Sequence, residues 1–76
     1  MTEQEFRRDF SEAVFALLYE SGMTRSELAF KAGISDATLS RIASGQHMPT
    51  LRTVLNIANA LQVPVEFLIG TDTWIA

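Results

Sequence analysis

The apolar residues of the chain return at intervals of three and four positions, and no stretch alternates between apolar and polar residues over a useful length. This spacing is that of an α-helix, in which every third or fourth side chain shares one face. We therefore predict an all-α fold, a compact five-helix bundle. The residues expected to face its core are Phe6, Phe10, Ala13, Val14, Leu17 and Leu18 in the first helix, Leu28, Ala29 and Ala32 in the second, Leu39 and Ile42 in the third, and Leu51, Val54, Leu55, Ile57, Ala58 and Leu61 in the fourth.

Hydroxyl residues and glycines mark the ends of these helices. Ser and Thr side chains accept hydrogen bonds from the free amides of a first helical turn, and glycine adopts the left-handed conformation that ends a helix. Thr2 with Glu5, and Thr24 with Glu27, have the spacing of a capping box. The predicted helices start at Thr2, Thr24, Ser35, Thr50 and Pro64, and all but the fourth end at a glycine, namely Gly22, Gly33, Gly45 and Gly70.

Length and composition indicate a single domain over residues 1–76, because so short a chain buries only one small core. Cysteine is absent and no apolar run approaches the roughly 18 residues that span a bilayer, so the cytoplasm is the expected location. His47 is the one histidine and has no partner at metal-ligand spacing, which favours an ordinary loop residue. The chain carries no phosphate-binding glycine loop and no nucleophile motif. We expect no metal, no cofactor and no catalysis.

Four residues near the middle of the chain have the spacing of a helix-turn-helix. Ala29 is small enough for two crossing helices to approach each other, and Gly33 suits a turn that needs a positive φ. Leu39 and Ile42, three residues apart, then bury one side of the following helix. Each residue alone is compatible with ordinary packing in a bundle. The four together, between two capped helix starts, indicate a helix-turn-helix.

Residues 12–69 resemble the helix-turn-helix domain of the Cro/C1-type (XRE family) phage repressors, a family that includes the controller proteins of restriction-modification systems. The resemblance is carried by MTRSELAFKAGISDATLSRIASGQHMPTLRTVLNIANALQVPVEFLIG. It implies a lambda-repressor-like bundle whose unit at about residues 24–44 binds double-stranded DNA, usually as a homodimer on a pseudo-palindromic operator. The implied function is a sequence-specific transcription regulator, a repressor or a controller, in a bacterial or phage-encoded, nucleoid-associated protein.

The net charge of −3 is unevenly distributed along the chain. Residues 1–23 carry −3 and residues 54–76 carry −2, whereas residues 24–53, with the predicted DNA-binding unit, carry +2. A DNA duplex contacts only one face of a protein. A chain with a negative net charge can therefore bind DNA through a segment that is locally positive.

By position in the family, the early residues of the third helix face the base edges in the major groove. Arg41 is the leading candidate for a bidentate contact to guanine, and the alternative is that its side chain is only solvated. Ala37 is a candidate for a contact to a thymine methyl group. Asp36 either accepts a hydrogen bond from a cytosine amino group or stabilises its own helix through the dipole. The predicted base-reading residues are Asp36, Ala37, Thr38, Ser40 and Arg41, and the predicted backbone contacts are Thr24, Arg25, Ser35, Ser44, Gln46, His47, Thr50 and Arg52.

The C-terminal part of the chain has more apolar residues than one small core can cover. The predicted homodimer interface consists of Val65, Phe67, Ile69, Trp74 and Ile75, the last two in the tail 71–76. An alternative places Trp74 back against the first helix, where it completes a single core. A functional alternative keeps the bundle but makes it a protein-interaction module with little or no DNA binding.

Overall fold

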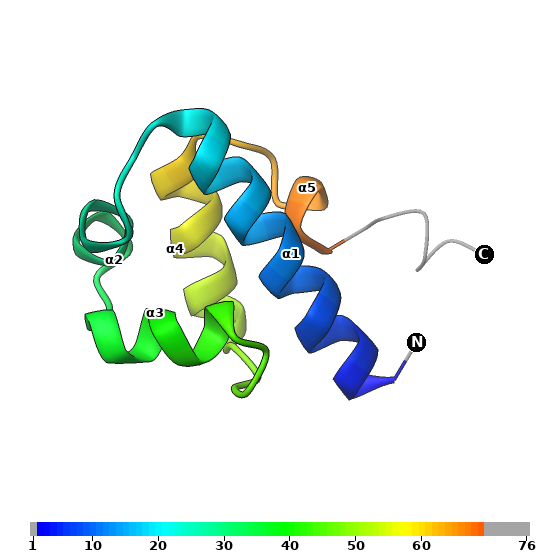
Figure 1. Cartoon of the computed structure of the whole chain (residues 1–76). Coiled ribbons are helices and arrows are strands. Elements are labelled where there is room, and N and C mark those ends of the chain that lie inside the picture. Colours follow the sequence, from blue (N-terminus) through cyan, green and yellow to red (C-terminus); the bar gives the residue numbers. More distant parts are fainter. Residues whose placement is uncertain (1, 70–76) are drawn as a thin grey trace.

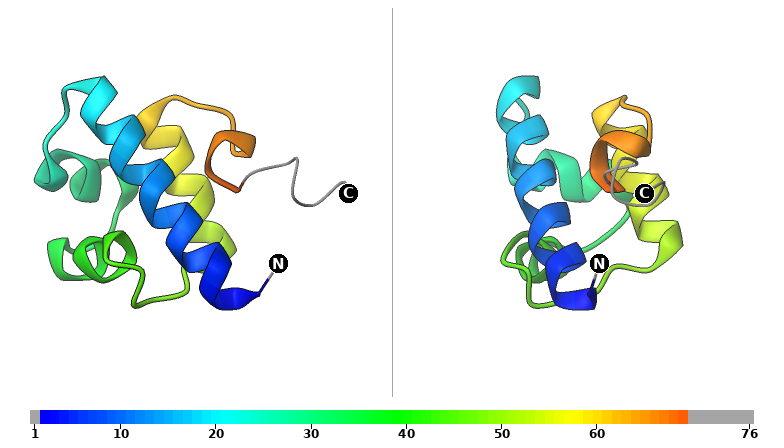
Figure 2. Two further views of the ribbon diagram at one scale, coloured as in Figure 1. Left: turned by 45° about the vertical axis from the view of Figure 1, so that its right-hand side comes forward. Right: turned by 90° about the vertical axis from the view of Figure 1, so that its right-hand side faces the viewer.

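The structure is a computed structural model that describes residues 2–69. Within this range the chain forms α1 (Glu3–Ser21), α2 (Arg25–Ala32), α3 (Asp36–Ala43), α4 (Leu51–Leu61) and α5 (Glu66–Ile69), and no strand. Figure 1 shows α2 and α3 to one side of the long helix α1 and of α4, and α5 to the other side. The left view of Figure 2 shows the same arrangement. The predicted all-α fold of five helices is confirmed.

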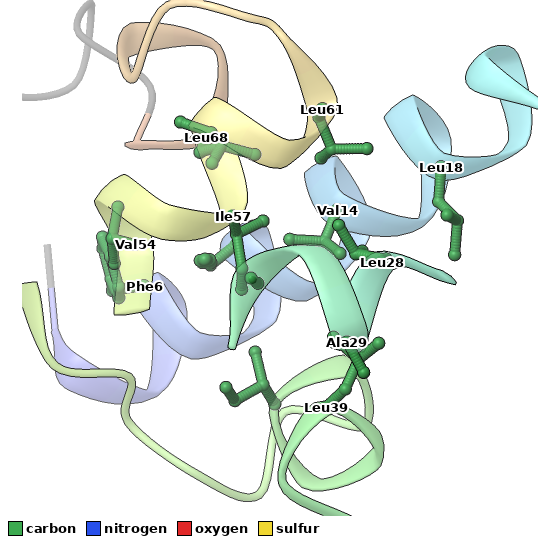
Figure 3. Packing of buried hydrophobic residues seen from close by; sticks show 14 residues of the cluster. Phe6, Val14, Leu18, Leu28, Ala29, Leu39, Val54, Ile57, Leu61 and Leu68 are labelled. Atoms are coloured by element: carbon green, nitrogen blue, oxygen red, sulfur yellow. The ribbon is translucent and has the colours of Figure 1, made fainter. Parts of the chain in front are cut away.

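One hydrophobic core joins all five helices. Val14, Leu28, Leu39, Ile57 and Leu68 converge on it, one from each helix, and each is at most 2% exposed (Figure 3). Helix α2 packs mainly against α4, while α1 packs against α3 and α5. The short helices are therefore held by burial against longer ones, since helices of this length are marginal by themselves.

The first four helices begin at the hydroxyl residues predicted from the sequence. Each N-cap oxygen accepts a hydrogen bond from the backbone N–H three residues later, at 3.0 to 3.2 Å; these caps are Thr2, Thr24, Ser35 and Thr50. The capping box is complete at Thr24, whose own N–H donates to the Glu27 carboxylate. At Thr2 the Glu5 carboxylate instead accepts from the Thr2 hydroxyl, so that predicted box is only half formed.

Helix α4 ends on a residue that is not glycine. Gln62 has a φ of 59°, in the left-handed region, and the following Val63 N–H donates to the Ala58 carbonyl at 3.0 Å. These are the features of a Schellman motif. A residue with a Cβ pays roughly 1 to 2 kcal/mol for this backbone conformation, a cost that glycine avoids.

We expect Gln62→Gly to raise the free energy of unfolding by about 0.5 kcal/mol. Glycine removes the left-handed strain, but part of that gain is offset because glycine loses more backbone freedom on folding. Urea denaturation measures the difference. Gln62→Ala is the control, because it shortens the same side chain and keeps the Cβ. An equal gain in the alanine variant would show that the backbone conformation is not the cause.

Two leucines predicted to face the core lie at the surface instead. Leu51 is 72% exposed and Leu55 43%, so the sequence prediction is wrong for both. They lie one helical turn apart on α4, beside the buried Val54. The elements packed around α4 cover only part of its wide apolar stripe, and these two positions fall outside that part.

The predicted dimer interface is described only in part. Phe67 on α5 is 60% exposed, while Val65 and Ile69 are half-buried and pack partly against the core. Trp74 and Ile75 lie outside the described residues.

His47 is exposed in the loop between α3 and α4, as predicted for a loop residue. Across residues 2–69, none of the helices has the length and apolar character needed to cross a membrane. In the same range, no three acidic or histidine side chains gather where they could share a metal ion.

Candidate nucleic-acid interface

The turn between α2 and α3 is short and closed by backbone hydrogen bonds. Gly33 has a φ of 71°, its N–H donates to the Phe30 carbonyl at 3.2 Å, and the Ile34 N–H donates to the Ala29 carbonyl at 3.0 Å. This is again a Schellman motif, here with the glycine that the left-handed position favours. Ala29 is 1% exposed, so a small side chain lies inside the angle between the two helices. Residues 33–35 thus set how α2 and α3 cross.

Helix α3 has one buried face and one open face. Leu39, Ile42 and Ala43 are buried against the core. At about 3.6 residues per turn, positions 37, 40 and 41 face away from these buried residues, and position 36 lies at the edge of the open side in the first turn. Four of the five predicted base-reading residues lie on this open side and are exposed, namely Asp36, Ala37, Ser40 and Arg41. We call them the α3 stripe.

The fifth predicted base-reading residue, Thr38, is half-buried and takes part in the cap of its own helix. Its N–H donates to the Ser35 Oγ at 3.0 Å, and the Ser35 hydroxyl donates to the Thr38 Oγ1 at 2.9 Å. Ser35 and Thr38 therefore hold the start of α3 in place. Because Thr38 is half-buried and its hydroxyl already accepts a hydrogen bond, its side chain is less available to a ligand than the side chains of the α3 stripe.

Asp36 is tied to the neighbouring helix. Its carboxylate accepts a hydrogen bond from the Ser26 hydroxyl at 3.3 Å, which links α2 to the first turn of α3. A carboxylate at that position also complements the positive end of the helix dipole. Two roles were predicted for Asp36. Its position in the first turn and its hydrogen bond to Ser26 agree with stabilisation of the helix, and the contact to cytosine stays a prediction.

Arg41 is the cation of the α3 stripe. It lies in the last turn of α3, is exposed, and makes no ion pair or side-chain hydrogen bond to any residue from 2 to 69. Its guanidinium group carries donors in a planar fork that matches the acceptor pair of guanine in the major groove. The structure thus leaves the Arg41 side chain exposed and unengaged among residues 2–69, and its contact to guanine stays a prediction.

The predicted backbone contacts are all exposed but differ in how far they are already engaged. The hydroxyls of Thr24, Ser35 and Thr50 serve as N-caps, and Ser44 donates to the Arg41 carbonyl at 3.0 Å. The Arg25 guanidinium lies 4.8 Å from the centre of the Phe15 ring, in cation–π geometry. The side chains of Gln46, His47 and Arg52 form no hydrogen bond within residues 2–69.

Helix α1 holds the end of α3, a contact that we did not predict from the sequence. Ser11 is buried and its hydroxyl donates to the Ala43 carbonyl, and Arg7 Nη1 donates to the Gln46 carbonyl at 3.4 Å. Ser11 lies three residues before Val14, on the core side of α1, and that placement is the one signal in the sequence for it. The acidic first helix therefore orients the loop that follows α3.

A capped helix, a glycine turn and a second helix with an open face together define a helix-turn-helix protein. A family model described as Helix-turn-helix, HTH_3, matches residues 16–68, which is most of the chain. The chain belongs to this family, and the family resemblance stated from the sequence is confirmed.

Two solved structures resemble the chain. The restriction-modification controller protein C.AhdI from Aeromonas hydrophila is 25% identical with a TM-score of 0.76, and the match covers 79% of this chain and 91% of that protein. An HTH_3 family transcriptional regulator from Vibrio cholerae is 24% identical with a TM-score of 0.86 over 97% of this chain, which shows a common fold. The chain spans 42% of that regulator's length. The comparison with curated proteins found no match.

Proposed function

We propose that the chain is a transcription regulator that binds double-stranded DNA in a sequence-specific manner and reads the major groove with α3. The observation that carries this proposal is the α3 stripe, which Leu39 and Ile42 hold outward by burying the opposite side of the helix. A helix of about 10 to 12 Å in diameter fits a major groove about 12 Å wide. Family membership and the likeness to a controller protein support the same class of function.

Within this proposal the residues of the stripe have separate roles. Arg41 donates two hydrogen bonds to a guanine, Ala37 contacts a thymine methyl group, and Asp36 and Ser40 contact neighbouring base edges. Phosphate contacts come from side chains around the ends of the neighbouring helices, where backbone amides also point outward. Gln46, His47 and Arg52 contribute most, since their side chains are exposed and are not engaged in capping.

We also propose that the protein acts as a homodimer that pairs through α5. Phe67 is exposed there between the half-buried Val65 and Ile69, and exposed aromatic side chains of this kind mark interfaces. Trp74 and Ile75 belong to the proposed interface as well. A two-fold pair spaces two copies of α3 by about 34 Å, one turn of DNA, and requires an operator with matching symmetry.

Selection from a pool of random double-stranded DNA tests the DNA-binding proposal. The full chain is expected to enrich one sequence with two related half-sites about 10 base pairs apart. A pool that remains random after repeated selection at low salt contradicts the proposal. That outcome favours the alternative of a protein-interaction module on the same bundle.

Sedimentation tests the dimer. Phe67→Ser is expected to weaken self-association about tenfold or more, because it removes a large apolar side chain from the centre of the proposed interface. Phe30→Ser is the matched control, since Phe30 is 86% exposed on α2, away from α5. Equal self-association of the wild-type chain and the Phe67 variant places the interface elsewhere.

We expect the salt dependence of DNA binding to be shallow for a protein of this type. Residues 24–53 contain four cations, Arg25, Lys31, Arg41 and Arg52, so few counterions are displaced. Titrations at several salt concentrations give the slope of log K against log salt, and we predict a slope less steep than about −8. Arg52→Ala is expected to reduce the slope further. A slope of −8 or steeper shows that additional cations contact the phosphates.

A further inference from the structure

An apolar groove of about 330 Å³ lies apart from the α3 stripe, between the starts of α1 and α4 and the region of α5. Leu51 and Leu55, the two leucines of α4 that the core leaves uncovered, contribute to its lining. Val65 and Ile69 line it from the α5 region, and Met48 lines it from the loop before α4. None of the described residues that line the groove is charged.

The groove has a surface that water solvates poorly. Exposed apolar area is unfavourable in proportion to its size, and small proteins leave such contiguous patches open mainly where something binds. Leu51 and Leu55 lie one turn apart and face the same opening, so a single apolar ligand can cover both.

We propose that the occupant of this groove is the C-terminal segment of the same chain, residues 70–76, with Trp74 and Ile75 as the side chains that enter it. Ile69, the last described residue, itself lines the groove, so the segment starts at its edge. Trp74 follows five residues later, which gives an extended reach of roughly 17 Å. Because the segment starts at the edge of the groove, Trp74 does not have to cross the molecule to enter it.

The composition of the segment matches the lining. Residues 70–76 contain one charged residue, Asp72, before two large apolar side chains, and they begin with Gly70, whose backbone can reverse direction. A short connection also gives the segment an effective concentration in the millimolar range at its own groove, which a second copy of the chain reaches only at similar protein concentration. These features favour docking within one chain.

The proposal is independent of DNA binding, and it replaces the assignment of Trp74 and Ile75 to the homodimer interface. Phe67 does not line the groove, so it stays outside when the segment docks. Trp74 is then shielded within its own chain, and Phe67 remains as the exposed aromatic side chain through which α5 can pair.

Fluorescence of the full chain without DNA tests the proposal, because Trp74 is the only tryptophan. We expect an emission maximum at shorter wavelength than that of free N-acetyltryptophanamide, and reduced quenching by acrylamide. Both are expected to stay constant over a hundredfold dilution. Leu55→Gln and Leu51→Gln are each expected to lower the docking equilibrium constant about tenfold, which corresponds to about 1.4 kcal/mol, and to raise quenching. Phe30→Gln, far from the groove, is expected to change neither signal.

Each other outcome overturns the proposal. Emission and quenching like those of the free indole show that the segment does not dock. Shielding that disappears on dilution shows that a second copy covers the groove. Shielding that is unaffected in both leucine variants, with circular dichroism showing an intact helical fold, places Trp74 at another site. Leu51 is mostly exposed, so its variant keeps the test valid if the Leu55 variant fails to fold.

Discussion

Phe10→Ala is expected to lower the free energy of unfolding by about 3 to 5 kcal/mol. Phe10 is 1% exposed at the centre of α1, and its ring packs edge to face on Phe6 with the ring centroids 5.8 Å apart. The substitution removes the buried ring and leaves a cavity between α1 and the elements that pack on it. A domain of 76 residues has a total stability of only about 4 to 11 kcal/mol. We therefore expect the variant to be partly unfolded at 37 °C.

Thermal and urea unfolding followed by circular dichroism measure this loss. Phe30→Ala is the matched control, because it makes the same chemical change at a side chain that is 86% exposed. Its stability is expected to stay within about 0.5 kcal/mol of the wild-type value. Similar losses in the two variants would mean that burial of Phe10 is not what stabilises the bundle.

Arg41→Ala is expected to remove most of the preference for one base pair in the selected operator. A bidentate contact to guanine provides about 1 to 3 kcal/mol of discrimination, which is about fivefold to 150-fold in relative affinity. The fold should persist, because Arg41 is exposed and its side chain makes no ion pair with residues 2–69. Competition binding between the selected operator and single-base variants measures the loss position by position.

Two further arginine variants distinguish base recognition from general attraction to DNA. Arg25→Ala is expected to weaken binding to most sequences alike, since Arg25 is predicted to contact the backbone. Arg8→Ala is expected to change little, because Arg8 lies on α1 and pairs with Asp9 at 3.4 Å. If the selected site is the same for the Arg41 variant and the wild-type chain, another residue of the α3 stripe reads the bases.

The positions of the helices follow from short-range chemistry and were predictable. An N-cap bonds an amide three residues away, and a glycine ends a helix within one turn, so Thr24, Ser35 and Gly33 specify their boundaries locally. The end of α4 lacks this signal, because Gln62 holds the left-handed position without being glycine.

Burial on α4 was predicted less well. The apolar stripe of this helix is wider than the arc that its neighbours cover, so periodicity alone assigned Leu51 and Leu55 to the core together with Val54 and Ile57. Which part of a wide stripe is covered depends on where the surrounding elements lie. That placement is a long-range property, and here it leaves the two leucines in the groove.

The candidate site also has a part that the sequence predicted and a part that only the tertiary structure shows. Periodicity places the residues of the α3 stripe on one side of the helix, and the buried Leu39 then determines which side is open. The hydrogen bond from Ser11 to Ala43 spans 32 positions of the sequence, and the one from Arg7 to Gln46 spans 39 positions. No local sequence pattern indicates either of them. They determine how the loop after α3 is held against α1.

The sequence by itself determined the number of helices, most of their ends and the turn that joins α2 to α3, because these depend on hydrogen bonds and backbone preferences within a few residues. The tertiary structure alone decided which apolar side chains are covered and which polar ones are used in capping or in contacts between helices. Those outcomes depend on packing between segments far apart in the chain, where the free energy of burial is shared among all five helices.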